Sequence, residues 1–380
     1  MRVAVVHNLP LGGARRRLAS QLDHLGDDIV EVCLETALPV TSEPIVVPFA
    51  PIAPTRAKVL RPPFRYRDLI MLIRAWREAA GHIRASGSDV VYLNPCQYLQ
   101  APPVLLEDIP PTLYFCDEPR RVDADPGARS TRRSLTRPLY GPAYATERWL
   151  DRAATCRAYQ LATNSRYTAA QIDRVYGRHA TVVTMGVADS LISHQPTPTV
   201  QPFLLTVGAL IPSKGHDLAI DVAARVSRPV VVVAPRHDDG EQARLQRLAE
   251  RLGVRLDVRV GISDAELAEL YCAAYATVYL AHREPLGLVS LEAQACGCPV
   301  IVAAEGGLPE TIIDGVTGWQ SPRDGASAAA LVERLADPAV RETMAAAARE
   351  HAKSCSWAAS AAEVGELLRT TRLRRPLAHR

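Results

Sequence analysis

The sequence predicts an α/β protein built from two successive doubly wound halves, each containing a parallel sheet. Short apolar runs alternate with helical periodicity along most of the 380 residues, a pattern typical of βαβ units. The alternation stops at the proline-containing stretch Asp189–Pro202 and then restarts. Because proline disfavours both helices and central strands, we interpret this stretch as a linker. Doubly wound sheets bind ligands beyond the carboxyl ends of their strands, so we expect a cleft between the two halves.

In the first half, the apolar run Arg2–His7 predicts the first strand. A turn at Gly12 and Gly13 then leads into a helix that ends at Gly26. Further strands are expected at DIVEVCL, DVVYLN, PTLYFC, YQLATNS and ATVVTMGV, and helices at Tyr66–Ala85 and Pro142–Ala158.

In the second half, strands are expected at FLLTVGAL, PVVVVAP, RLDVRVG, ATVYLA and CPVIVA, with helices between them. A last helix begins at Ser356 and Trp357. The expected division is therefore a first domain over 1–190, a linker over 191–202, a second domain over 203–355 and a final helix and tail over 356–380.

Composition excludes several classes of protein. A formal net charge of +3 is too small to indicate nucleic-acid binding. The first residues, MRVAVVHNLPLGG, read as a strand and a turn and lack the apolar core of a signal peptide, and no run predicts a membrane span. The eight cysteines lie in apolar contexts, and the C-G-C of Cys296 and Cys298 matches no usual zinc spacing. We expect reduced thiols and a cytoplasmic protein.

The stretch REPLGLVSLEAQACGCPVIV predicts a ligand site. Gly287 lets the backbone approach a ligand, and the helix that follows offers amides and a positive dipole end to an anion. Glu284 and Glu292 could accept hydrogen bonds from two sets of hydroxyl groups on either side of that anion. A ligand with a polyol, a diphosphate and another polyol is a nucleotide sugar. The spacing alone is also consistent with a chance pair on a solvated helix face.

A second motif, LTVGALIPSKGHDLAI, lies in a matching position after a strand. Gly208 ends that strand, and Lys214 and Gly215 precede a helix that runs from His216. Such a loop could bring backbone amides and an ammonium group onto a phosphate. Alone it is equally consistent with an ordinary strand end and a surface lysine, but together the two motifs favour a binding site.

On these motifs the chain resembles the retaining glycosyltransferases of the GT-B fold, of the group 1 or family 4 type that includes mannosyltransferases. NSRYTAAQIDRVYG and VVTMGVAD also fit that family. The resemblance implies a hexosyltransferase with two Rossmann-like domains facing a cleft and a final helix that packs back on the first domain. It assigns Glu284 to the donor sugar and Glu292 to the ribose. The implied diphosphate and nucleotide contacts are Gly13, Gly208, Lys214, Gly261, Gly287, Leu288 and Val289.

The chain departs from the family pattern twice. Ala209 stands where an arginine usually helps to neutralise the diphosphate, so Arg236, Arg283 or another cation could compensate. In YFCDEPRR, Asp117 stands where a histidine is expected. Asp117 could accept hydrogen bonds from the sugar or acceptor, act as a general base, or cap the next turn. The implied catalytic set is Glu284, Lys214 and Asp117.

The expected reaction needs no metal and no cofactor besides the donor. The family has no agreed nucleophile, so the leaving phosphate is expected to help deprotonate the acceptor on one face of the sugar. Asp123 and Asp125 fit the Asp-x-Asp pattern of metal-dependent transferases, but they lie in a polar loop and not at a strand end. The same segment carries a basic cluster that reads as a solvated loop or, alternatively, as an acceptor or membrane-surface patch: Arg120, Arg121, Arg129, Arg132, Arg133 and Arg137.

Alternatives remain open. A sugar-nucleotide 2-epimerase shares the architecture, and a catalytically idle nucleotide-sugar-binding subunit is consistent with the missing arginine and histidine. A dehydrogenase is disfavoured because HNLPLGGARRRL lacks the G-x-G-x-x-G loop. The acceptor is unidentified, with a small specialised metabolite favoured, and GDP is slightly favoured over UDP. Peripheral membrane contact and the oligomeric state stay undetermined.

Overall fold

The computed structural model describes residues 1–52, 61–124, 137–193 and 200–373. The chain divides into two compact units. Unit 1 comprises Met1–Asn164, Thr168–Val183 and the residues from Ser360 onward, and unit 2 comprises Ser165–Tyr167 and Thr184–Ala359.

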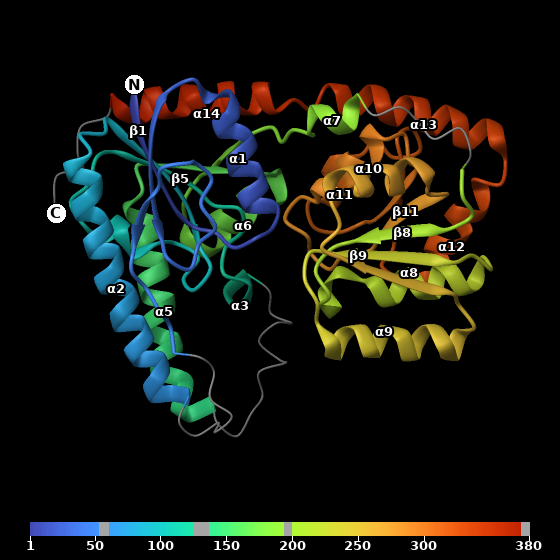
Figure 1. The fold of residues 1–380 in the computed structure, drawn as a ribbon, viewed down its shortest axis with the longest axis horizontal. Coiled ribbons are helices and arrows are strands. Elements are labelled where there is room, and N and C mark those ends of the chain that lie inside the picture. Colours follow the sequence, from blue (N-terminus) through green and yellow to red (C-terminus); the bar gives the residue numbers. More distant parts are fainter. Residues whose placement is uncertain (53–60, 125–136, 194–199, 374–380) are drawn as a thin grey trace. The chain divides into compact units, whose positions relative to one another are not determined.

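Within the described residues, unit 1 contains a seven-stranded parallel sheet in the order β3-β2-β1-β4-β5-β6-β7 (Figure 1). Its central strands are buried apolar runs on both faces, as a parallel sheet covered by helices requires. The direction of strand succession reverses between β1 and β4, which makes their carboxyl ends a switch point. The strands are β1 (Arg2–Asn8), β2 (Asp28–Leu34), β3 (Ile45–Val47), β4 (Val90–Cys96), β5 (Thr112–Phe115), β6 (Gln160–Thr163) and β7 (Thr181–Val182).

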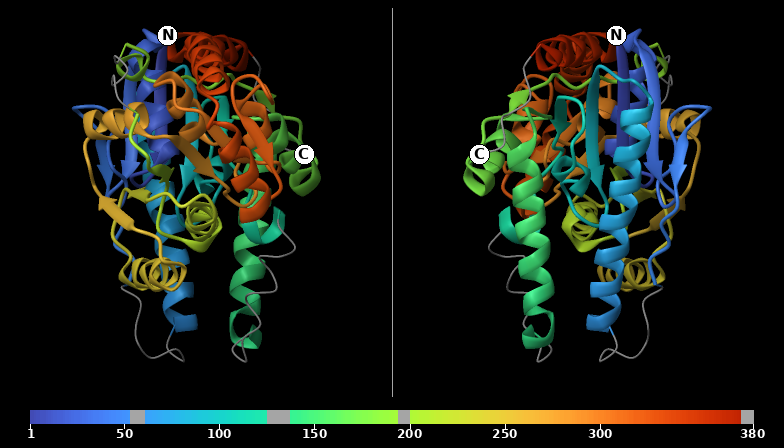
Figure 2. Two further views of the ribbon diagram at one scale, coloured as in Figure 1. Left: turned by 90° about the vertical axis from the view of Figure 1, so that its right-hand side faces the viewer. Right: turned by 90° about the vertical axis from the view of Figure 1, so that its left-hand side faces the viewer.

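The helices of unit 1 cover this sheet with apolar faces. In α2 the buried residues Leu69, Leu72, Trp76 and Ile83 recur at helical spacing and belong to one core with the strands. α2 and α5 both extend beyond the sheet (Figure 2) and are linked there by the ion pair of Arg65 and Glu147. The helices are α1 (Gly13–Leu25), α2 (Arg61–Ala85), η2 (Pro103–Leu106), α3 (Arg121–Ala124), α5 (Arg137–Arg157) and α6 (Arg166–Tyr176).

The last helix, α14 (Trp357–Arg372), belongs to unit 1 from Ser360 onward. The hydroxyl of Ser360 accepts a hydrogen bond from Gln21 of α1 at 2.9 Å. Further along, Thr371 donates to Gln160 at 3.0 Å, and Arg372 pairs with Asp89. These contacts anchor the helix along the edge of unit 1 where β1, β4 and β6 begin.

Unit 2 repeats the architecture with a six-stranded parallel sheet in the order β10-β9-β8-β11-β12-β13, counted over the described residues. Its switch point lies between β8 and β11. The strands are β8 (Leu204–Val207), β9 (Val230–Ala234), β10 (Leu256–Val260), β11 (Ala276–Tyr279), β12 (Val300–Ala303) and β13 (Trp319–Ser321). The helices are α7 (Asp189–Ile192), η3 (Pro212–Lys214), α8 (His216–Arg225), α9 (Asp239–Leu252), α10 (Asp264–Ala273), α11 (Leu288–Ala295), η4 (Leu308–Thr311), α12 (Gly325–Arg334) and α13 (Pro338–Lys353).

The predicted fold class, two doubly wound parallel sheets, is confirmed. Some boundaries differ from expectation. The first residues of the predicted linker are helical, because Asp189–Ile192 forms α7. α5 begins at Arg137, so Pro142 lies within the helix and not at its start. The last strand of unit 1 is shorter than the expected Ala180–Val187. In the part of the chain that the structure describes, no helix combines the length and apolar character that crossing a bilayer requires.

Candidate active site

The switch point of unit 2 brings the two sequence motifs together. β8 and β11 are neighbours in the sheet, and the loops that follow them carry Lys214 and Glu284. The loops are joined by a backbone hydrogen bond from His282 to Ser213 at 2.7 Å. Gly215 has a φ of 72°, and a Cβ there would overlap the carbonyl oxygen of Leu280. Only glycine therefore allows the close approach that sets the two side chains face to face.

Lys214 and Glu284 form an ion pair. The Lys214 Nζ lies 2.9 Å from each carboxylate oxygen of Glu284 and 3.3 Å from the hydroxyl of Tyr279. The two side chains remain 18% and 13% exposed, so both can be reached from solvent. The sequence predicted separate tasks for these residues and did not predict their pairing. A Cβ at Gly208 would stand 3.3 Å from the Lys214 stem, so this glycine makes room for it.

The start of α11 lies beside this pair. Gly287 precedes the helix with a φ of 103°, and a Cβ there would overlap Leu308. Leu288 and Val289 form the first turn, whose amides have no carbonyl partner inside the helix. The backbone that leads into the turn is fixed by Gly307, whose amide donates to the Glu284 carbonyl at 2.8 Å. Amides at a helix start can bind an anion, and the Lys214 ammonium lies beside this helix start.

The residue before Glu284 has a strained backbone. Arg283 has a φ of 46°, a conformation that non-glycine residues rarely adopt. Its amide donates to the Glu305 carboxylate at 3.0 Å, and the ring of His282 contacts the same oxygen at 2.8 Å. Glu305 thus holds the turn that presents Glu284.

Glu292 lies one helical turn further along α11 and is 6% exposed. Its carboxylate accepts a hydrogen bond from the Tyr271 hydroxyl at 3.0 Å. Gly261 ends β10 with a φ of 68°, and its amide donates to Ala234 at the end of β9. Gly261 thus lies at the carboxyl edge of the sheet, the edge at which the loops with Lys214 and Glu284 also begin. The nucleotide contacts of Glu292 and Gly261 stay predictions.

The backbone of Ala209, the position that lacks the family arginine, is held by a hydrogen bond to His216. His216 Nε2 lies 3.1 Å from the Ala209 carbonyl, so Nε2 carries the proton. The Nδ1 then accepts from the Thr206 hydroxyl at 3.2 Å. Burial lowers the pKa of His216, which keeps the ring neutral. The compensating candidates, Arg236 and Arg283, are both exposed.

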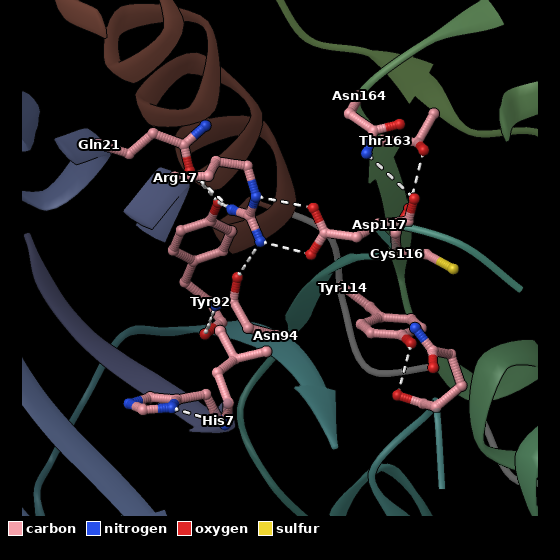
Figure 3. Close-up of polar contacts among 12 residues, drawn as sticks. His7, Arg17, Gln21, Tyr92, Asn94, Tyr114, Cys116, Asp117, Thr163 and Asn164 are labelled. Carbon is pink, nitrogen blue, oxygen red and sulfur yellow. Dashed lines mark hydrogen bonds and ion pairs between the residues drawn. The ribbon is translucent and has the colours of Figure 1, made fainter. Parts of the chain in front are cut away.

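Unit 1 carries a second polar cluster, centred on Arg17 of α1 (Figure 3). The guanidinium bonds both carboxylate oxygens of Asp117 at 2.9 Å. It also donates to Gln21 at 2.8 Å, to Tyr92 at 3.0 Å and to Asn94 at 2.8 Å. These five bonds use all five N–H donors of an arginine. Burial lowers the pKa of Arg17, but Asp117 and Tyr92 raise it by more, so the pKa is raised overall.

Asp117 follows β5, and its backbone is fixed from the neighbouring strand β6. The Thr163 hydroxyl donates to the Cys116 carbonyl at 2.8 Å, and the Asn164 amide donates to the Asp117 carbonyl at 3.0 Å. The Asp117 carboxylate belongs to a partly buried ion pair with Arg17, whereas the sequence also allowed it to cap the next turn. Gly13, the other predicted site residue of unit 1, begins α1 and is exposed.

The sequence did not reveal the role of Arg17. A signal was present, because Arg17, Leu18 and Gln21 share the buried face of α1, where a charged side chain needs a partner. The partners come from β4 and the end of β5, so spacing along the chain could not identify them.

The basic segment after β5 is largely paired where the structure describes it. Asp123 contacts Arg148 at 2.9 Å and Arg120 at 3.9 Å, and Arg121 pairs with Glu118. Asp125 and the arginines of the cluster with higher numbers lie outside the described side chains: Arg129, Arg132, Arg133 and Arg137.

Among the described residues, one group has the composition of a metal site: His7, Glu31 and Cys33, whose ligand atoms lie within 4.8 Å of one another. The His7 Nδ1 accepts from the Leu9 amide at 3.2 Å, which places the proton on Nε2 facing Glu31. Glu31 also accepts bonds from Val40 and Thr41. Its hydrogen bonds make this group an anchor for the loop after β2.

Residues 189–351 match the family model described as glycosyl transferases group 1. The match covers less than half of the chain, and over this region the chain is similar to the group 1 glycosyl transferases. The resemblance inferred from the sequence motifs is thereby confirmed. The region contains all of the predicted donor-site residues of unit 2.

Curated proteins similar to this chain are named D-inositol 3-phosphate glycosyltransferases. The protein from Kribbella flavida is 41% identical over 170 residues, which are 40% of this chain and 40% of that protein. The protein from Thermomonospora curvata is 35% identical over 239 residues, 54% of this chain and 56% of that protein. The chain thus spans about half or less of the length of these relatives.

Solved structures match this chain over nearly its whole length. Sucrose-phosphate synthase from Thermosynechococcus elongatus gives a TM-score of 0.78 at 22% identity, covering 97% of this chain and 98% of that one. HepE from Anabaena, solved with UDP and glucose, gives 0.74 at 18% identity, covering 97% and 100%. At these identities the likeness establishes the fold, two Rossmann-like domains of the GT-B type.

Proposed function

We propose that the protein is a retaining hexosyltransferase that moves a sugar from a nucleoside-diphosphate sugar to an acceptor hydroxyl without a metal ion. The observation that carries this proposal is the ion pair of Lys214 and Glu284 at the switch point of unit 2. A cation, a carboxylate and a helix N-terminus in one place match a ligand with a diphosphate next to sugar hydroxyls.

On donor binding, Lys214 exchanges part of its contact with Glu284 for a diphosphate oxygen. The ammonium is a compact charge on a flexible stem, so this exchange needs only a change of rotamer. Glu284 then accepts hydrogen bonds from the hydroxyls of the sugar, and the first-turn amides of Leu288 and Val289 receive the second phosphate. Glu292, with Tyr271, is assigned to the ribose.

The reaction breaks the bond from the sugar C1 to the phosphate oxygen and forms a bond from C1 to the acceptor oxygen. The acceptor proton passes to the leaving phosphate oxygen on the same face, which gives retention. Lys214 and the α11 amides stabilise the negative charge that grows on the phosphate, the interaction that contributes most in reactions of this kind.

The nucleoside base and the acceptor are proposed in less detail than the reaction. The sequence slightly favours GDP, while HepE was solved with UDP and with UDP-glucose, so both bases are to be tested. The relatives' names specify a phosphorylated cyclic polyol as acceptor, which supports a small polyhydroxylated acceptor here.

A thermal-shift screen of GDP, UDP, ADP and dTDP with their sugars tests the donor. The best donor is then incubated with a panel of acceptors, and the anomeric configuration of the product is read by NMR. We expect stabilisation by one nucleotide and a product with retained configuration. An epimerised donor formed without acceptor would identify an epimerase, and binding without turnover an idle subunit. No stabilisation by any nucleotide would overturn the proposal.

A further inference from the structure

We propose that Arg17 is a positioning residue that fixes Asp117 as a hydrogen-bond acceptor for the hydroxyl groups of a neutral polyol ring. The ring belongs either to the transferred sugar or to the acceptor molecule. The inference rests on the proposed function, because it names what unit 1 recognises in the same reaction.

Arg17 itself is unavailable to a ligand. Its side chain is 2% exposed, and its five N–H donors are bonded inside unit 1. The Phe115 ring lies against the guanidinium, 3.7 Å from its central carbon. A phosphate could therefore bind Arg17 only by breaking bonds that hold α1, β4 and the end of β5 together. The residue acts through its neighbours.

Asp117 is the neighbour that faces outward. Its side chain is 15% exposed, and it stands directly after β5, at the carboxyl edge of the sheet near the switch point. Each carboxylate oxygen accepts one bond from Arg17, and a carboxylate oxygen can accept two. Beyond the two bonds from Arg17, the Asp117 carboxylate has positions left that can accept hydrogen bonds from a ligand.

Asn164 supplies a second acceptor beside it. The Asn164 Nδ2 donates to the Asp117 carbonyl at 3.0 Å, which fixes the orientation of the side-chain amide, since a flipped amide would set two oxygens together. Its Oδ1 is buried, and no donor among the described residues reaches it. A buried acceptor without a donor is unfavourable unless a ligand or water supplies one.

Asp117 and Asn164 follow β5 and β6, which are adjacent strands, and they lie side by side (Figure 3). The Asp117 carboxylate and the Asn164 amide oxygen can only accept hydrogen bonds, so a ligand there must supply donor groups. The same oxygens would repel a phosphate. Hydroxyls of a sugar ring or cyclic polyol meet this requirement.

The experiment measures steady-state kinetics with the nucleotide sugar that stabilises the protein most, and with myo-inositol as probe acceptor. The variants are Arg17→Lys, which keeps the charge but offers three donors without a planar fork, and Asp117→Asn. We expect the KM of one substrate to rise about 10-fold or more in both variants, because a hydroxyl loses a fixed partner. A rise for the nucleotide sugar identifies the sugar ring, and a rise for inositol alone identifies the acceptor.

A deoxy analogue of the affected substrate separates positioning from general support of the fold. Wild type should prefer the hydroxylated substrate, and Asp117→Asn should lose that preference, whereas a purely structural role would weaken both substrates alike. Arg77→Lys is the matched control, because Arg77 pairs with Glu107 on the surface of unit 1. Unchanged KM values for both substrates, or equal losses with both analogues, would overturn the inference. Failure of wild type to bind any nucleotide sugar would instead overturn the proposed function.

Discussion

Each unit places one charged pair beyond the carboxyl ends of its sheet, and the two pairs are built differently. In unit 2, Lys214 touches both oxygens of Glu284 with a single nitrogen, and both side chains are partly exposed. In unit 1, Arg17 holds Asp117 with a planar fork and is bonded to three further residues in the buried interior.

This difference makes the Lys214–Glu284 pair of unit 2 exchangeable and the Arg17–Asp117 pair of unit 1 fixed. A lysine can leave its partner by rotating about its stem, and a ligand phosphate compensates for the contact that is lost. A buried arginine with all of its donors bonded cannot move without leaving several polar groups unpaired. We therefore expect substitutions in unit 2 to act on turnover and donor binding, and substitutions around Arg17 to act through the geometry of Asp117.

The largest effect is expected for Lys214→Ala. Loss of one charge-stabilising group lowers kcat by about 100-fold to 1,000-fold. The measurement is kcat at saturating donor, with circular dichroism to confirm the fold. Lys353→Ala is the control, because Lys353 pairs with Glu350 and both side chains are exposed in the same unit. Unchanged turnover of the Lys214 variant would show that the lysine serves only to neutralise Glu284.

The second prediction concerns Asp151, a buried acid of unit 1 that lacks the bonded cation of Asp117. Burial raises its pKa from 3.8 to about 6, and hydrogen bonds from Tyr176 and Ala101 offset only part of that shift. Because the folded state binds the proton more tightly, the contribution of Asp151 to stability is full below pH 3.8 and is lost as the pH rises through about 6. A shift of about two units corresponds to roughly 3 kcal/mol.

The measurement is the free energy of urea unfolding between pH 4 and pH 7 for wild type and Asp151→Asn. The asparagine cannot titrate, so its stability should fall less over this range than that of wild type, and the difference should grow by up to about 3 kcal/mol. Parallel pH profiles for the two proteins would contradict the prediction. They would mean that Asp151 ionises alike in the folded and unfolded chain.

The third prediction separates the two tasks in unit 2. Glu284→Gln keeps the size of the side chain but turns one acceptor oxygen into a donor, and it also removes the charge that faces Lys214. An unpaired hydroxyl costs about 1–3 kcal/mol, so affinity for the intact sugar nucleotide should fall by roughly 5-fold to 150-fold. Affinity for the free nucleoside diphosphate should be retained or increase, because Lys214 is released from its partner.

Isothermal titration with both ligands measures this separation. Glu350→Gln is the matched control, because the Glu350 side chain is exposed on α13 and pairs with Lys353. Equal losses for the nucleotide and the sugar nucleotide would assign Glu284 to the support of its loop. Equal affinities for wild type and variant would leave the pair of glutamates as a coincidence of spacing.

A smaller effect is expected for Glu292→Ala. If its carboxylate holds the ribose, affinity for the nucleoside diphosphate should fall by about 10-fold, the value of a charged hydrogen bond. Tyr271→Phe removes the contact to Glu292 while leaving the carboxylate in place, and its affinity should stay within a few-fold of wild type. If both variants lose affinity equally, Glu292 acts by supporting α10 and not by contacting the nucleotide.

The sequence predicted most of the fold because local signals define it. Apolar runs located the central strands, and the prolines and glycines located several turns. β3 was missed because three residues, Ile45–Val47, are too few to show a period. The start of α5 was misplaced because Pro142 reads as a helix start, although the helix begins one turn earlier and continues through it.

The site was predicted only where its residues lie in sequence motifs. Lys214 and Glu284 were selected from separate loops, but their pairing depends on β8 and β11 being neighbours, which spacing does not give. Arg17 and Asp117 are 100 residues apart and meet only through the order of strands β1, β4 and β5. Interactions between distant segments are the part of the site that needs the structure.

The smallest effect is expected for chelation, since EDTA should leave turnover unchanged. The Asp-x-Asp pattern of Asp123 and Asp125 would be the natural metal ligand, but the Asp123 carboxylate already contacts Arg148 and Arg120. A divalent cation at Asp123 would have to displace both arginines and would face their charges at close range. In the proposed mechanism Lys214 and the α11 amides neutralise the charge of the diphosphate, the task that a metal ion would otherwise perform.

The test is kcat with and without EDTA, followed by addition of Mn²⁺ or Mg²⁺. If activity collapses in EDTA and returns with the ion, a metal and not Lys214 stabilises the leaving group. The Lys214–Glu284 pair would then not be the exchangeable pair that distinguishes unit 2 from unit 1.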